Sequence, residues 1–144
     1  MKFRKATKKD LGKIAEIFRI ESAKPPYNKK KTSKKALAGI KKDFKDNDLF
    51  VAIIEGKIVG FIMIRKDSDI KNRRWINEFW ILKNYQRKGI GREMMNKIEG
   101  MYKKKNIKTL GLAAYTRKGG AVDFYKKLNY KVDNRVVSMT KKLK

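Results

Sequence analysis

One short segment of this 144-residue chain has the residue types and spacing of a phosphate-binding loop. An apolar stretch at 75–82 leads into Gln86-Arg87-Lys88-Gly89-Ile90-Gly91, and a helical pattern begins at Ile90. Glycines permit a tight turn, and the first turn of a helix presents unsatisfied N–H groups in a dipole field that favours an anion. Arg87, Lys88 and Arg92 add positive charge around this turn.

Taken alone, this pair of glycines is a weak signal, and a purely structural loop is the alternative. The segment lacks the Gly-Lys-Ser/Thr of a Walker loop and the longer glycine pattern of a dinucleotide-binding fold. Its meaning therefore depends on the elements that position it.

The first part of the chain favours a short strand and two helices. A strand is expected at 3–6, and Thr7 followed by Asp10 forms a capping pattern ahead of a helix that starts near Lys8. That helix should end before Pro25-Pro26, because a residue before proline avoids the α region. A basic connector then covers 23–35, and Ser33 can cap a second helix with apolar positions at Leu37, Ile40 and Phe44.

The remainder alternates strands with helices. Apolar, β-branched runs at 49–54 and 58–64 have hairpin spacing, and a third strand is expected at 75–82. Helical spacing follows from Ile90 to about Lys105, and then a strand at 109–115, a helix at 121–128 and a strand at 136–139 are expected. The fold class is α/β or α+β with a mixed, mostly antiparallel sheet flanked by helices, in a single domain over 1–144.

The amino-acid composition excludes several kinds of catalytic and metal-binding site. The chain has no Cys and no His, which excludes Ser-His-Asp and Cys-His nucleophiles, disulfides and thiolate or imidazole zinc sites, and no metal is expected. Its 40 Lys+Arg against 14 Asp+Glu give a formal charge of +26, so polyanions and phosphorylated cofactors are candidate partners. No signal-like or membrane-length apolar stretch is present, which favours a soluble cytoplasmic protein that does not use a membrane. We expect it to be a monomer or a homodimer.

Several segments together resemble the GCN5-related N-acetyltransferase (GNAT) family. Its motif A, Gln/Arg-x-x-Gly-x-Gly/Ala between the fourth strand and the following helix, matches residues 86–91. The start of the chain at 3–10, Val59-Gly60-Phe61, the strand at 78–86 and the late segment at 121–130 also resemble family segments in the same order.

The resemblance implies acetyl transfer from acetyl-CoA to a primary amine in a ternary complex. The pyrophosphate would rest on backbone N–H groups from Arg87 to Arg92, and the pantetheine arm would pair with strand backbone near 81–83. A backbone N–H there could also stabilise an oxyanion. Cofactor-binding positions carried over in this way are Ile81, Leu82, Lys83, Gln86, Arg87, Lys88, Gly89, Ile90, Gly91, Arg92 and Lys118. Lys118 stands where the family often has Asn.

Proton transfer needs a base for the amine and an acid for the departing thiolate. Tyr125 matches the family's frequent general acid, although a Tyr beside Phe124 and Leu128 is also an ordinary core residue. Glu78 is the base candidate. In strict alternation its face holds Ile76, Trp80 and Leu82, which would desolvate the carboxylate and raise its pKa; a bulge would change the faces, and a solvent-facing or lysine-paired Glu is the alternative.

The sequence indicates the identity of the acetyl acceptor less directly. We expect a protein or peptide amine, held by the connector at 23–35 and by loops near 133–136; the Lys-rich connector disfavours polyamines and lysine-rich tails. The alternatives are an acceptor linked to nucleic acid, such as aminoacyl-tRNA, and a non-catalytic module that binds CoA or RNA.

Overall fold

The computed structural model describes residues 1–117 and 120–143, and its sheet is built on a central hairpin. Strands β2 (Asp48–Ile54) and β3 (Lys57–Lys66) are antiparallel and joined by the two-residue turn Glu55-Gly56. Both strands are rich in β-branched and aromatic residues, and their central residues are buried, as expected for strands covered on both faces. The predicted hairpin is confirmed.

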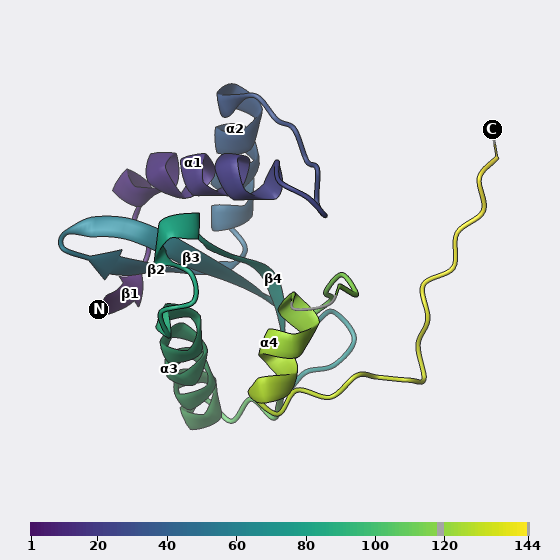
Figure 1. Cartoon of the computed structure of the whole chain (residues 1–144). Helices are drawn as coiled ribbons and strands as arrows, with labels where there is room; N and C mark the ends of the chain where they lie inside the picture. Colours follow the sequence, from purple (N-terminus) through teal and green to yellow (C-terminus); the bar gives the residue numbers. More distant parts are fainter. Residues whose placement is uncertain (118–119, 144) are drawn as a thin grey trace. The chain divides into compact units, whose positions relative to one another are not determined.

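Three further strands extend the hairpin into a sheet of order β1-β2-β3-β4-β5. Strand β1 (Lys2–Lys5) pairs with β2 and strand β4 (Arg73–Ile81) pairs with β3, both antiparallel. Strand β5 (Thr109–Gly111) runs parallel to β4. The sheet is therefore mixed and mostly antiparallel, which confirms the predicted fold class (Figure 1).

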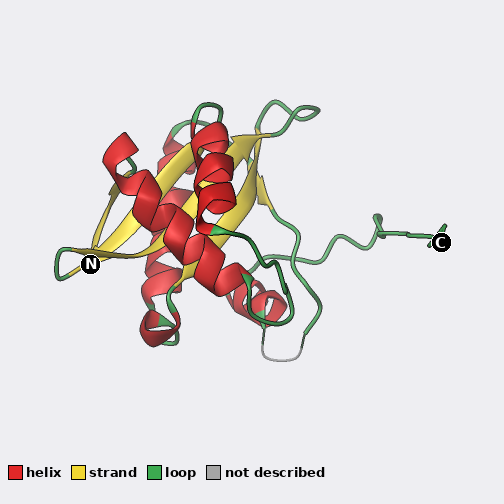
Figure 2. Cartoon of the chain, turned by 90° about the horizontal axis from the view of Figure 1, so that it is seen from above, coloured by secondary structure: helices red, strands yellow, loops and turns green. Residues whose placement is uncertain are grey.

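Helices cover both faces of this sheet. Helices α1 (Leu11–Ser22) and α2 (Ser33–Phe44) lie on one side and α3 (Ile90–Lys104) on the other (Figure 1). Seen from the side of α1 and α2, the helices lie across the strands (Figure 2). Phe61 and Met63 of β3 belong to the hydrophobic core shared with α1 and α2, whereas the alternate residue Ile62 is equally buried but faces α3.

The chain divides into two compact units, residues 1–113 and residues 114–144. The first unit contains the whole sheet and helices α1 to α3. The second contains α4 (Ala121–Lys127), a seven-residue helix followed by a chain segment without regular secondary structure. A single domain over 1–144 stays a prediction.

Three details of the sequence-based prediction were wrong. Thr32, not Ser33, caps α2, and its hydroxyl accepts a hydrogen bond from the Lys35 amide at 3.1 Å. Strand β5 ends at Gly111, because its pairing with β4 ends there. Residues 136–139 form no strand: Val136 is 70% exposed, and a short β-branched run is not a strand without a neighbouring strand to pair with.

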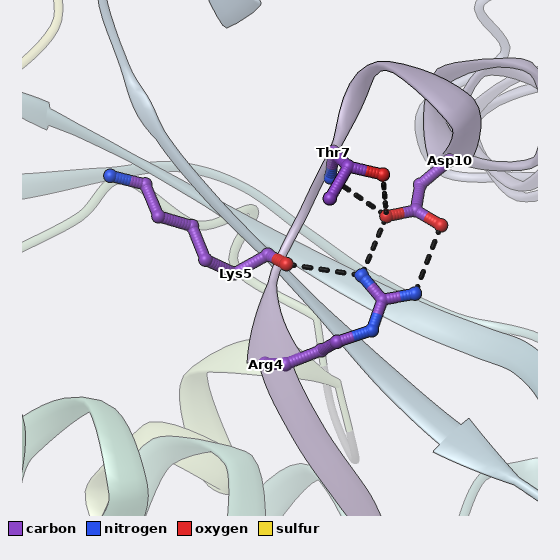
Figure 3. Close-up of polar contacts among 4 residues, drawn as sticks. All are labelled: Arg4, Lys5, Thr7 and Asp10. Atoms are coloured by element: carbon purple, nitrogen blue, oxygen red, sulfur yellow. Dashed lines mark hydrogen bonds and ion pairs between the residues drawn. The ribbon is translucent and has the colours of Figure 1, made fainter.

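A charged corner joins β1 to the first helix. Both terminal guanidinium nitrogens of Arg4 donate to the Asp10 carboxylate, at 2.7 and 3.1 Å, and the Thr7 amide and hydroxyl also donate to it (Figure 3). Asp10 ends the short 3-10 helix η1 (Lys8–Asp10) and is 7% exposed. The Arg4 hydrogen bonds lower the pKa of Asp10 to about 2, helped by those from Thr7, and the predicted capping pattern is confirmed.

We expect Asp10→Asn to destabilise the protein at neutral pH by about 1–2 kcal/mol, because it replaces charge-assisted hydrogen bonds with neutral ones. A lowered carboxylate pKa stabilises the fold above the unfolded-state pKa, so this contribution should disappear as pH falls from about 4 toward about 2. Urea unfolding of wild type and variant across that range measures it. Asp69→Asn, at an exposed carboxylate, is the control and should have no comparable effect.

Candidate active site

The glycine loop connects β4 to α3 through the short 3-10 helix η2 (Lys83–Tyr85). Arg87 and Gly89 both have positive φ, 61° and 81°, and Gly89 is the N-cap of α3. The first backbone bond of the helix runs from the Glu93 amide to the Gly89 carbonyl at 3.0 Å. The amides of residues 90–92 therefore have no acceptor within the helix, which is the geometry of an anion-binding helix start.

This loop has the charge and exposure that a diphosphate requires. Arg87, Lys88, Gly89 and Arg92 are all exposed, and the Lys88 ammonium lies 5.8 Å from the Tyr85 ring centroid. Basic side chains thus surround a helix terminus whose dipole also attracts negative charge. The residues present fit the pyrophosphate of CoA.

The Gln86 side chain fastens the loop to two other elements. Its amide nitrogen donates to the Ile81 carbonyl at 2.7 Å and to Oε1 of Glu21 at 3.3 Å. Glu21, in the last turn of α1, is 6% exposed and also accepts a hydrogen bond from the Lys24 ammonium at 2.8 Å. Gln86 therefore links the loop to the end of β4 and to the end of α1.

The end of β4 next to the loop extends beyond the part of the strand that pairs with β5. Its ladder with β5 covers only Arg73–Trp75, whereas β4 continues to Ile81. Two of the backbone groups expected to contact pantetheine have partners within the protein: the Leu82 amide donates to the Val59 carbonyl at 2.9 Å, and the Ile81 carbonyl accepts from Gln86. Lys83 begins η2, where it is exposed. Cofactor contact along 81–83 stays a prediction.

Strand β4 contains a β-bulge that determines where Glu78 lies. Met63 of β3 is opposite Glu78 and the next residue, Ile64, is opposite Ile76, so Asn77 is an extra residue in β4. Residues opposite each other in an antiparallel pair lie on the same face. Glu78 therefore shares the face of Met63, which α1 and α2 cover, and Ile76 lies on the α3 face.

The strict alternation expected from the sequence was wrong for one neighbour. Trp80 and Leu82 pack against the core of α1 and α2, on the face of Glu78, as predicted. Ile76 does not lie on that face, because the bulge at Asn77 reverses the faces between it and Glu78.

Glu78 is a half-buried carboxylate with one direct partner. The Trp80 indole N–H donates to its Oε2 at 2.5 Å. Burial raises the pKa of Glu78 above the ordinary carboxyl value, while the Trp80 hydrogen bond and the ammonium groups of Lys29 and Lys31 act in the opposite direction. Desolvation has the larger effect, which moves the group toward the range useful to a general base.

The two remaining candidates lie outside the first unit. Tyr125 is on α4 in the second unit, where its ring makes edge-to-face contacts with those of Phe124 and Tyr130, at 5.1 and 5.5 Å between centroids. Its role as an acid stays a prediction. Lys118 falls outside the described residues.

Sequence reasoning missed several residues around Glu78 and Gln86. The alternation pattern placed Trp80 beside Glu78 but did not indicate its hydrogen bond. Glu21 lies 65 positions from Gln86, and no local pattern connects them. Tyr27 of the connector packs its ring against Trp80 at 4.7 Å between centroids, a contact that depends on how the connector folds.

The described part of the chain contains neither a group of metal-ligating side chains nor a helix of membrane-spanning length and hydrophobicity. Across 1–117 and 120–143, no three acidic, His or Cys side chains are grouped as a metal ion would require. Within the same ranges, every helix is too short or too polar to cross a membrane.

This chain is similar to known acetyltransferases in sequence and in fold. The model of the family described as "Acetyltransferase (GNAT) family" matches residues 14–130. A curated relative, an uncharacterized N-acetyltransferase of Methanocaldococcus jannaschii, is 30% identical over 134 residues, which are 88% of this chain and 59% of the relative. The chain thus spans about three fifths of the length of that relative.

Solved structures share the fold over nearly the full chain. A possible acetyltransferase from Clostridium difficile 630 superposes with a TM-score of 0.81 and 26% identity, covering 96% of each chain. An aminoglycoside acetyltransferase from an uncultured soil metagenomic sample, solved with trehalose, has a TM-score of 0.72 and 21% identity, covering 99% of this chain and 96% of that one. The second likeness concerns the fold alone.

We expect Gly60→Ala to destabilise the protein by about 1–3 kcal/mol, because overpacked sites must shift neighbouring groups. Gly60 of β3 lies opposite Ile81, and an added Cβ would lie 2.9 Å from the Trp80 carbonyl oxygen and 3.0 Å from an Ile81 side-chain carbon. Thermal or urea unfolding measures the effect.

Gly39→Ala is the matched control. Apart from the neighbouring backbone of α2 itself, no heavy atom of the described residues lies within 4 Å of a Cβ added at Gly39, so this variant should be unchanged or more stable by up to about 1 kcal/mol. Equal stability of the Gly60 and Gly39 variants would contradict the close approach of β3 and β4 at the site.

Proposed function

The chain belongs to the GNAT family of acetyltransferases, and on that premise we propose that it transfers an acetyl group from acetyl-CoA to a primary amine. The observation that carries this proposal is the junction of β4 with α3 at Gly89, which has a left-handed conformation. The same strand, β4, carries the desolvated carboxylate of Glu78. The first feature suits a phosphorylated donor, and the second suits deprotonation of an amine.

The donor site uses backbone groups more than side chains. The amides of residues 90–92 would bind the pyrophosphate, with Arg87, Lys88 and Arg92 as the surrounding charge. Gln86 would hold the end of β4 in position through its bond to the Ile81 carbonyl. Acetyl-CoA supplies a thioester whose acetyl carbon is open to attack by an amine.

The acceptor arrives as an ammonium ion and must lose a proton before its nitrogen can attack. Glu78 is the proposed base: its carboxylate takes that proton directly or through a water molecule. Trp80 holds Oε2 of Glu78 through its indole N–H, which orients the group. As the C–N bond forms and the C–S bond breaks, the Tyr125 hydroxyl is the proposed proton donor to the leaving sulfur. The attacking nitrogen then loses its second proton to the Tyr125 phenolate, which leaves an amide, CoA as the thiol and a regenerated Tyr125 hydroxyl.

The remaining parts of the proposal concern the extent of the domain, the acceptor, the cellular location and the oligomeric state. Residues 1–144 are proposed to form one acetyltransferase domain. The acceptor is a protein or peptide amine, and the protein acts in the cytoplasm as a monomer or homodimer.

We expect acetyl-CoA to bind the protein one-to-one and Gly89→Val to weaken that binding by about tenfold or more. A bulky residue at positive φ costs about 1–2 kcal/mol, and 1.4 kcal/mol corresponds to about tenfold in affinity. The Val side chain would also occupy the space through which a phosphate reaches the backbone. Calorimetric titration near physiological salt measures the affinities.

Gly100→Val is the matched control, since it places the same side chain at an exposed position of α3 with no heavy atom within 4 Å of the added Cβ. ATP and pyrophosphate serve as anion controls, because a protein of charge +26 attracts many anions. Equal weak binding of all three ligands, or full affinity in the Gly89 variant, would contradict the donor site.

We expect Glu78→Gln to lower kcat/KM by about a hundredfold without changing acetyl-CoA affinity, because general bases typically contribute between about 10² and 10⁴ in rate. In the wild type the rate should rise with pH as Glu78 loses its proton, at a pH above the ordinary carboxyl range because burial raises its pKa. The variant should lose this ascending limb.

Two further variants test that reading. Glu16→Gln removes an exposed carboxylate of α1 that pairs with Lys13, and it should leave the profile unchanged. Tyr125→Phe should lower the rate while keeping the ascending limb, if Tyr125 is the acid. An ascending limb that persists in Glu78→Gln would assign the base to another group.

A further inference from the structure

The connector between α1 and α2 is folded back onto the end of α1. The Lys29 amide donates to the Ser22 carbonyl at 2.8 Å, and the amides of Tyr27 and Asn28 both donate to the Lys24 carbonyl at 3.0 Å. These bonds hold the middle of the connector over the face of the sheet that contains Glu78, as the Tyr27 ring contact with Trp80 shows.

Two aromatic rings from other elements pack against Trp80, the residue that bonds Glu78. Trp80 of β4, which donates to the carboxylate, has Phe18 of α1 at 6.0 Å and Tyr27 of the connector at 4.7 Å between ring centroids, both edge-to-face. Such rings form a rigid apolar wall, and they lower the effective dielectric around a neighbouring charge.

Two ammonium groups of the connector complete this surface. The Lys31 Nζ lies 4.9 Å from the Phe18 ring centroid, which places it at the aromatic wall. Lys29 and Lys31 are both among the charges that favour the charged form of Glu78, and Lys30 between them is not. The surface thus presents one carboxylate and two cations, with Asp43 of α2 a further negative charge acting on Glu78.

These charges select among amines. A simple ammonium ion that approaches Glu78 meets two positive groups and has nothing to offer them. A carboxylate or phosphate near the nitrogen would pair with Lys29 or Lys31 while the ammonium faces Glu78. Both ends of such an acceptor would then be matched in charge.

Resting on the proposed function, we propose that the acceptor is a primary amine with an anionic group within a few bonds of its nitrogen, bound between Glu78 and the ammonium groups of Lys29 and Lys31. An α-amino group whose own residue has an acidic side chain fits this description, as does an amine that bears a phosphate. A lysine side chain distant from any anion does not.

The test compares acceptors that differ only in this charge. Peptides of equal length that begin with Glu, Gln, phosphoserine or Lys are assayed with the wild-type protein and acetyl-CoA, and free glutamate and glutamine distinguish a peptide from an amino acid. We expect kcat/KM for Glu to exceed that for the isosteric Gln by about tenfold, because two close charge pairs each contribute a few-fold. The Lys peptide should be the poorest acceptor.

Four single substitutions then separate local charge from net charge. Lys29→Gln and Lys31→Gln should each reduce the preference for Glu over Gln by about three- to fivefold. Lys30→Gln changes the net charge by the same amount and should leave that preference within about twofold, since Lys30 is not among the charges that shift the pKa of Glu78. Lys31→Arg should retain it.

A second readout does not depend on turnover. With CoA in place of acetyl-CoA, the calorimetric affinity of the Glu peptide should fall in the Lys29 and Lys31 variants and stay unchanged in the Lys30 variant. Transfer without preference for Glu, or an equal loss in all three variants, would overturn the inference and leave the proposed function standing. Absence of transfer to every amine by a protein that binds acetyl-CoA would overturn both.

Discussion

A single extra residue in β4 determines which side chains of this strand lie on each face of the sheet. Because Asn77 has no counterpart in β3, the strand reverses its faces between Ile76 and Glu78. Ile76 packs under α3, and Glu78 and Trp80 lie under α1 and α2. A bulge also bends its strand, and the pairing of β4 with β5 ends at Trp75, just before Asn77. The same irregularity thus places a carboxylate on the face of the connector and leaves a strand edge beside the glycine loop.

Part of the positive charge of this protein is concentrated at two places in the first unit. Cationic groups gather at the glycine loop, where a helix terminus already favours an anion, and again on the connector, where Lys29 and Lys31 act on Glu78. Glu78 experiences opposing influences: burial raises its pKa, and the two lysines and the Trp80 indole restrain that rise. Desolvation has the larger effect on the pKa of this carboxyl group, which we propose as the base for the acceptor ammonium ion.

The glycine loop and the connector are physically linked within the first unit. Gln86 bonds both to the end of β4 and to Glu21, and Glu21 in turn holds Lys24 at the start of the connector. Glu21 is almost fully buried, so its carboxylate is a fixed point between the proposed donor and acceptor sides. Gln86, which we propose as a cofactor-binding residue, is therefore connected through Glu21 to the segment proposed to hold the acceptor.

The sequence by itself determined most of the helices and strands and the glycine loop. Local rules specify a β-branched hairpin, the Thr7 and Asp10 capping pattern, and a glycine that precedes an amphipathic helix, so these features were predictable. Only the tertiary structure decided which neighbours Glu78 has, because an inserted residue in one strand is visible only against the register of its partner. The same holds for the bond between Gln86 and Glu21, and for the unpaired run at 136–139: each depends on groups distant in sequence, which no local periodicity encodes.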